Sequence, residues 1–85
     1  MFLAISHNTG DPTPYLAAEA EQTRELARQG ALRTVLVKAD WSGAVLLLEA
    51  ADQAAARELL DTLPLVQAGV AAFELTEVIA APEMP

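Results

Sequence analysis

An unbroken apolar run, AVLLL at residues 44–48 followed by Glu49, is the feature that most constrains the fold of this 85-residue chain. Such a run between turn residues is typical of a strand at the centre of a sheet that is covered on both faces. A chain of this length forms one small domain, residues 1–85, and has little structure with which to cover two faces. We therefore expect a central strand at residues 44–49 and a partner for one face of its sheet.

Three more strands are predicted around this run. Residues 2–7, 32–38 and 71–79 are rich in β-branched and apolar side chains, and turn residues bound them. In the last of these, Phe73 and Leu75 should point to one face, and Glu74 and Thr76 to the other. ADWSG, residues 39–43, forms a short turn between the second and third strands.

Two helices are predicted between the strands. The first spans residues 14–29: Thr13 caps it, Pro14 suits its first position, and Gly30 fits the left-handed position just past its end. The second begins after Asp52, which caps it, and runs to about Leu63. Its inner face carries the apolar spacing i, i+3, i+4, i+7 at Ala56, Leu59, Leu60 and Leu63. Pro64 is expected to end this helix.

The predicted order, β-α-β-β-α-β, indicates an α+β fold: a ferredoxin-like sheet with both helices on one face. The other face is left bare, and its apolar residues cannot face water. We expect two such sheets to pack face to face, which gives a homodimer, or a higher assembly of dimers, with a barrel-like interior. Residues 79–85 are expected to form a loose tail or an arm that contacts the partner.

The composition excludes several classes of protein. The net charge of −7 disfavours nucleic acids and anionic membrane surfaces, and the absence of cysteine excludes disulfides and thiolate chemistry. A single histidine excludes a metal site built from several histidines of one chain. Neither a signal peptide nor a membrane span is recognisable, so a soluble cytoplasmic protein is expected.

Two segments resemble a known family. ELARQGALR, residues 25–33, and ELLDTLPLVQAGVAAFELTEV, residues 58–78, resemble muconolactone isomerase and its relatives in the dimeric α+β barrel superfamily. The Leu-Pro-Leu between the second helix and the last strand is the most specific match. Gln67-Ala68-Gly69 also resembles YCII-related proteins, another branch of this superfamily.

The resemblance implies a small-molecule enzyme. Its pocket would lie between the first helix and the sheet and take lactones, cyclic enones or polyketide-like compounds, with no metal and no organic cofactor. In the isomerase branch a carboxylate on the first helix moves the proton, and counting back from Gly30 places that carboxylate at Glu19. In the segment ALRTVLVKADWSG after Gly30, Thr34, Leu36 and Val37 stand where the isomerase pattern has polar or aromatic residues, which argues against a charged muconolactone as substrate.

The helical periodicity of residues 14–29 supports Glu19 independently. Leu16, Ala20, Thr23 and Ala27 share a face with Leu26 beside it, and Glu19 falls between Leu16 and Leu26 on this inner side. Glu21 and Glu25 fall on the opposite side, three residues before Arg24 and Arg28. A carboxylate that faces an apolar pocket should have a raised pKa, which suits proton transfer. The alternative is a glutamate at the rim that reaches water.

His7 and Asp40 are the other candidate proton carriers. His7 ends the first strand on the side of Leu3 and Ile5, and histidine takes up and releases protons near neutral pH. It either assists Glu19 or a substrate oxygen, or bonds the following loop. Asp40 follows the second strand, where the YCII branch carries an aspartate; the histidine which that branch carries on the first helix is missing here.

Asp40 and four more residues are candidates for substrate binding. Arg33 and Lys38 either hold an enolate or carboxylate or pair with Glu49 or Glu74 across the sheet. Trp41, at a hairpin tip, forms a dimer contact or a platform for the substrate. Tyr15, in the first helical turn, is a lid residue or a packing residue.

The leading hypothesis is a cofactor-free isomerase, cyclase or dehydratase. It moves a proton on a small apolar carbonyl compound, with Glu19 as acid or base and His7 assisting. The alternative is a non-catalytic dimeric protein of the same fold that binds a ligand or serves as an accessory subunit, and a purely structural dimer comes third. A carboxylate with a raised pKa in the pocket favours the enzyme, and a pocket without an ionisable group favours the binding protein.

Overall fold

The computed structural model describes residues 1–81 as four strands, two main helices and two short helical segments. In chain order they are β1 (Phe2–Asn8), the 3-10 turn η1 (Thr13–Tyr15), α1 (Leu16–Arg28), β2 (Leu32–Val37), β3 (Ala44–Leu48), α2 (Gln53–Asp61), α3 (Pro64–Gln67) and β4 (Ala71–Glu77). All four predicted strands and both predicted helices are present. The predicted tail lies mostly outside the described residues.

The four strands form one antiparallel sheet in the order β2-β3-β1-β4. The apolar strand β3 and the N-terminal strand β1 are central, and their register pairs Phe2 with Leu48 and Ile5 with Val45. Strands β2 and β4 form the edges. This is the ferredoxin-like α+β fold that the order of elements predicts.

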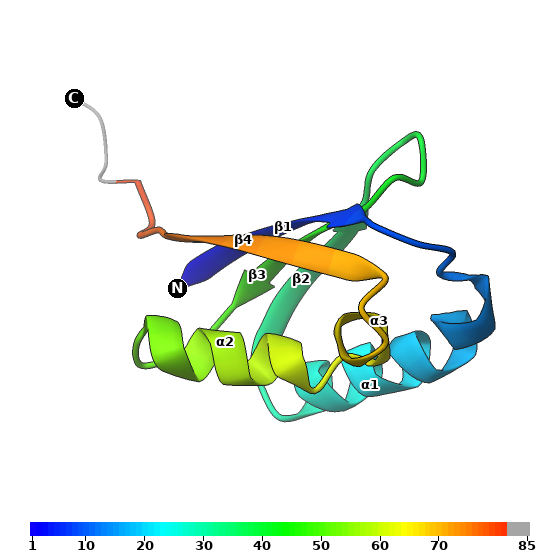
Figure 1. Cartoon of the computed structure of the whole chain (residues 1–85). Coiled ribbons are helices and arrows are strands. Elements are labelled where there is room, and N and C mark those ends of the chain that lie inside the picture. The colour runs from blue at the N-terminus through cyan, green and yellow to red at the C-terminus, as the bar shows by residue number, and fades with distance from the viewer. Residues whose placement is uncertain (82–85) are drawn as a thin grey trace.

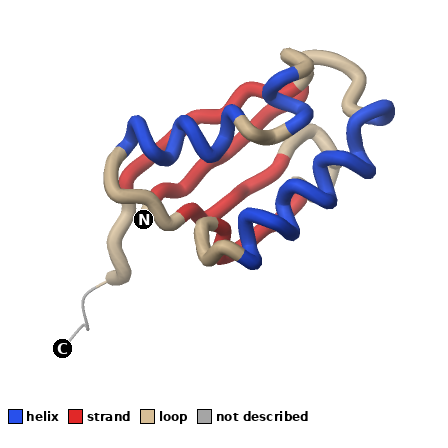
Figure 2. The backbone as a smooth tube through the Cα atoms, turned by 90° about the horizontal axis from the view of Figure 1, so that it is seen from below, coloured by secondary structure: helices blue, strands red, loops and turns tan. Residues whose placement is uncertain are grey.

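All helices lie on one face of the sheet (Figure 1). Seen from that side, α1 and α2 lie over different sides of the sheet, with strands visible between them (Figure 2). The core lies between the two layers and consists of inward residues of β1, β2 and β3, the inner faces of α1 and α2, and the residue just before α3: Phe2, Ala4, Leu26, Leu32, Leu46, Leu48, Ala56, Leu60 and Leu63. Leu59 packs against this core, so the predicted apolar face of the second helix is confirmed.

The other face of the sheet has no cover within the described chain. Ile5 is 40% exposed and Leu36 is 58% exposed, and both alternate with inward-facing neighbours. Leu3, Val45 and Leu47 are half-buried between them. We call these five residues the open face. The predicted one-sided sheet is confirmed, whereas its pairing with a second chain remains a prediction.

The start of the first helix differs from the prediction. Thr13 does not cap it with its side chain; the backbone N–H of Thr13 instead donates to the Asp11 carboxylate at 3.0 Å. With proline at positions 12 and 14, the chain first makes the 3-10 turn, and α1 begins only at Leu16. The end of α1 is as predicted, because Gly30 follows it with a φ of 79°.

The second helix also ends slightly earlier than predicted, before it reaches Pro64. Asp52 caps it as expected, accepting from the N–H of Ala55 at 2.8 Å, but the helix ends at Asp61. Leu63 is then extended, with ψ of 130°, as is usual before a proline. Pro64 opens the short helix α3, so it starts a helix as well as separating two.

Within residues 1–81, no helix is both long enough and apolar enough to cross a membrane.

Candidate functional site

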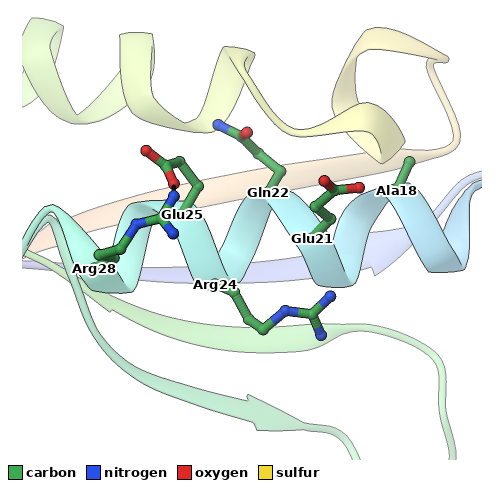
Figure 3. Close-up of a pocket in the computed structure, with 6 residues that line it drawn as sticks. All are labelled: Ala18, Glu21, Gln22, Arg24, Glu25 and Arg28. Atoms are coloured by element: carbon green, nitrogen blue, oxygen red, sulfur yellow. Dashed lines mark ion pairs between the residues drawn. The ribbon is translucent and has the colours of Figure 1, made fainter.

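The structure has a polar hollow on the outer side of α1. Six residues of this one helix line it: Ala18, Glu21, Gln22, Arg24, Glu25 and Arg28 (Figure 3). Glu25 and Arg28 form an ion pair, as their spacing predicts. We call this hollow the outer groove. Paired opposite charges on a solvated helix face are common on protein surfaces, so we do not take the outer groove as the functional site.

A second hollow, which we call the pocket, lies between α1 and the sheet and has a volume of about 420 Å³. Its walls come from six parts of the fold: β1, the segment Pro12–Thr13 before α1, α1, the β2–β3 hairpin, α3 and β4. They are mostly apolar, and the lining residues are Ser6, Asn8, Pro12, Thr13, Leu16, Glu19, Ala20, Thr23, Val35, Val37, Trp41, Gly43, Ala44, Leu46, Leu65 and Phe73. An apolar hollow with a few polar groups is typical of a small-molecule site.

Glu19 is the only ionisable side chain among these lining residues. It is half-buried, and its Oε1 accepts a hydrogen bond from the N–H of Leu65 at 3.1 Å. Burial raises the pKa of Glu19, and the hydrogen bond from Leu65 offsets part of that rise. Among residues 1–81, no second hydrogen bond to this carboxylate is present, so its other oxygen can meet a ligand.

The hydrogen bond to Glu19 follows from the local sequence. Pro64 has no N–H, and the N–H of Leu65, in the first turn of α3, has no carbonyl four residues earlier to bond within that helix. Glu19 of α1 supplies the acceptor. The Leu-Pro-Leu segment therefore holds the carboxylate of a different helix in place, which sequence reasoning did not predict.

The floor of the pocket is a local break in the β1–β3 ladder. The Oγ of Ser6 accepts from the N–H of Ala44 at 2.8 Å, and its own hydrogen has only a long contact to the carbonyl of Ala44, at 3.4 Å. Gly43 packs directly on the backbone of Ser6. Beside it, the side-chain amide of Asn8 donates to the carbonyl of Trp41 at 3.2 Å. The second N–H of Asn8 remains available to a ligand oxygen, and the hydroxyl of Ser6 becomes available only if it leaves its long hydrogen bond to Ala44.

The structure does not bring His7 and Glu19 together. Ser6 lines the pocket, and His7, the next residue of β1, is exposed on the side of Ile5. Successive side chains of a strand point to opposite faces, so the sheet separates His7 from the pocket of its own chain.

Asp40 lies in the exposed hairpin, where its carboxylate accepts from the hydroxyl and the N–H of Ser42 at 2.6 and 3.0 Å. These hydrogen bonds lower the pKa of Asp40, the side-chain bond most. It does not line the pocket, whereas Trp41 does, although Trp41 is 77% exposed. A φ of 62° at Trp41 marks the tip of this turn.

The remaining candidates lie outside the pocket. Arg33 forms an exposed ion pair with Glu49 at 2.6 Å, one of the two cross-sheet pairs considered. Lys38 belongs to the base of the hairpin, where its N–H donates to the carbonyl of Gly43 at 2.9 Å. Tyr15 is half-buried just before α1, and its side chain does not line the pocket.

Sequence reasoning missed Ser6, Asn8 and the N–H of Leu65. The alternation of β1 held the signal for the first two, because Ser6 and Asn8 share a face with the core residues Phe2 and Ala4. Within residues 1–81, no group of three or more histidine, aspartate or glutamate side chains is placed to hold a metal ion.

No protein-family model and no curated protein matches this chain. Among solved structures, it is similar to 5-chloro-2-hydroxyhydroquinone dehydrochlorinase from Burkholderia phenoliruptrix AC1100, in complex with 2,5-dihydroxybenzoquinone. The two share 16% sequence identity with a TM-score of 0.74, over 95% of this chain and 96% of the other. The likeness shows a common fold along nearly the whole length of both chains.

Proposed function

We propose that this protein is a small-molecule enzyme that moves a proton on an apolar carbonyl, lactone or polyketide-like compound, as an isomerase, cyclase or dehydratase. The observation that carries the proposal is Glu19, a half-buried carboxylate with a raised pKa at an apolar pocket. A group of this kind is suited to general acid–base catalysis. The resemblance of Leu-Pro-Leu to muconolactone isomerase and its relatives, and of Gln67-Ala68-Gly69 to YCII-related proteins, supports the same class.

The similar solved structure adds support at the level of reaction class. It is a dehydrochlorinase, and removal of hydrogen chloride takes a proton from the substrate together with chloride. Its bound molecule, 2,5-dihydroxybenzoquinone, is a small ring with carbonyl and hydroxyl groups. A pocket of about 420 Å³ has room for a compound of this size.

The proposed chemistry uses the two oxygens of Glu19 differently. Oε1 stays on the N–H of Leu65, which fixes the carboxylate. The other oxygen takes a proton from the carbon next to a carbonyl group, and the bonding electrons move to the carbonyl oxygen as an enolate. Ser6 and Asn8 offer neutral hydrogen-bond donors to that oxygen, and Glu19 returns the proton at a second carbon or to a leaving group.

Solvent exchange tests the proposal without knowledge of the natural substrate. The chain is incubated in deuterated water with a panel of cyclic enones, lactones and cyclic ketones, and deuterium uptake is followed by NMR. We expect uptake into at least one compound, and Glu19→Gln should slow it by about 10²–10⁴-fold because the amide cannot accept the proton. Glu21→Gln, two residues along the same helix but in the outer groove, is the matched control and should leave the rate unchanged.

The panel also distinguishes the enzyme from the ligand-binding alternative. Saturable binding of a compound with acidic C–H bonds, without catalysed exchange, would favour a binding or accessory protein. Equal exchange rates in Glu19→Gln and the unmodified chain would remove Glu19 from the mechanism.

We further propose that the working unit is a homodimer joined through the open face. Burying that face removes Ile5 and Leu36, 40% and 58% exposed in the single chain, from water. Sedimentation at micromolar concentration should give at least twice the chain mass of 9.0 kDa. Ile5→Lys should dissociate the assembly, whereas Ala54→Lys, exposed on α2, should not. A monomer for the unmodified chain would refute this proposal.

A further inference from the structure

The charge of the pocket is one-sided. Glu19 lines the pocket. The five lysine and arginine residues of the chain all lie among the described residues, and none of them lines the pocket. Arg28 pairs with Glu25 and Arg33 with Glu49, while Arg57 donates to the carbonyl of Phe73 at 3.2 Å. Lys38 lies close enough to Asp40 to help lower its pKa. Arg24 lies in the outer groove of α1.

This arrangement bears on which molecules can enter. An anion would lose part of its water shell in an apolar hollow and would find a carboxylate there in place of a counter-ion. The net charge of −7 adds a weaker, long-range repulsion. A neutral ring loses little on leaving water, and Ser6 and Asn8 can bond its oxygen atoms.

We propose that the pocket admits uncharged, oxygen-bearing ring compounds and rejects anionic ones, with Glu19 as the residue that sets this specificity. The proposal rests on the proposed function in one respect, because only the proposed proton transfer excludes a cationic compound as substrate. An ammonium group would bind the free oxygen of Glu19 and so block the atom that has to take the proton. A neutral compound leaves that oxygen free.

Binding of three one-ring probes tests the proposal: resorcinol is neutral, benzenesulfonate is anionic at all working pH values, and benzylammonium is cationic. Each is titrated into the ¹⁵N-labelled full chain, and the amide signals of Ala20, Ala44 and Leu65 report on occupancy of the pocket. Resorcinol should bind about tenfold or more tightly than benzenesulfonate, the effect of one unpaired like charge nearby. Glu19→Gln should reduce this preference to about threefold or less.

The control is Glu21→Gln, which removes the same charge from the outer groove and should leave the preference intact. Two results would overturn the proposal: equal binding of resorcinol and benzenesulfonate, or an equal effect of the two glutamine variants. Binding of benzylammonium that Glu19→Gln weakens and Glu21→Gln does not would support the charge of Glu19 as the source of the selection. Failure of all three probes to shift the pocket amides would overturn it as well. Because the assay measures binding alone, a chain that selects neutral rings but catalyses no exchange would refute the proposed function and leave this inference standing.

Discussion

Substituting Gly43 by alanine tests how tightly the floor of the pocket is built. An added Cβ would lie 2.0 Å from the carbonyl oxygen of Ser6, 2.7 Å from its carbonyl carbon and 3.1 Å from the Cα of His7. Ordinary contact begins near 3.4 Å, so the hairpin and β1 would have to separate by roughly 1.4 Å. The obstacle is backbone on both sides, which no change of side-chain rotamer can relieve.

The magnitude follows from the bonds that flank the contact. The N–H of Asn8 donates to the carbonyl of Ser42 at 2.7 Å, and the N–H of Ala44 donates to Ser6 Oγ at 2.8 Å. Losing both leaves two donors poorly satisfied and should lower the free energy of unfolding by about 2–4 kcal/mol. A domain of this size has a total of about 4–13 kcal/mol, so the loss is large enough to shift the unfolding midpoint measurably.

Urea unfolding followed by far-ultraviolet circular dichroism measures the effect, with Gly30→Ala as the matched control. Gly30 has a φ of 79° but open space around its Cα, so alanine there should cost only the strain of the left-handed conformation, about 1–2 kcal/mol. The expected order is therefore a larger loss at Gly43, where φ is not positive, than at Gly30. A loss at Gly43 equal to or smaller than that at Gly30 would refute the close packing of this floor.

Three further predictions concern single side chains. Burial raises the pKa of Glu19, so the stability that its protonated form contributes is full below its ordinary pKa and is lost as pH rises through the folded-state pKa. Urea unfolding should therefore show that Glu19→Gln becomes more stable relative to the unmodified chain as pH rises between about pH 4 and pH 7. A difference in stability that stays constant over this range would contradict the raised pKa. Ser6→Ala leaves the N–H of Ala44 without its acceptor and should cost about 1–3 kcal/mol in the same assay, against less than about 0.5 kcal/mol for the exposed Ser42→Ala. Asp52→Ala removes the cap bond to Ala55 and should cost about 0.5–2 kcal/mol, with earlier amide exchange in the first turn of α2 as the local sign; unchanged exchange there would count against the cap.

The fold could be predicted because periodicity and turn residues pointed to the same elements. The apolar run of β3, the cap at Asp52 and the left-handed Gly30 each depend on local chemistry that the sequence displays directly. The errors lie where neighbouring signals competed. Thr13 sits between two prolines, whose fixed φ favours a 3-10 turn before α1, and Pro64 serves as the first residue of a helix as well as a break between helices.

The candidate site was predictable only in part. Glu19 could be placed at the pocket because it lies on the inner side of a helix whose periodicity is visible. Its bond to Leu65 depends on the contact between α1 and α3, which are far apart in sequence. The chemistry of histidine suggests a catalytic role for His7 beside Glu19. The alternation of side chains along β1, which places His7 on the side of Ile5, is the better guide to the face of the sheet on which it lies. The closure of Gly43 on Ser6 is a backbone contact, and a glycine in a turn does not by itself show which strand it packs against.

The alternation of side chains along β1 limits how this part of the protein can evolve. Ser6 and Asn8 belong to the pocket, whereas Ile5 and His7, interleaved with them, belong to the opposite surface. The two surfaces are thus encoded in odd and even positions of one short segment. Insertion or deletion of a single residue within β1 would exchange the two sets, because every following side chain would turn to the opposite face of the sheet. The lining of the pocket and the outer surface can therefore diversify independently by substitution, but neither tolerates a change in strand length by one residue.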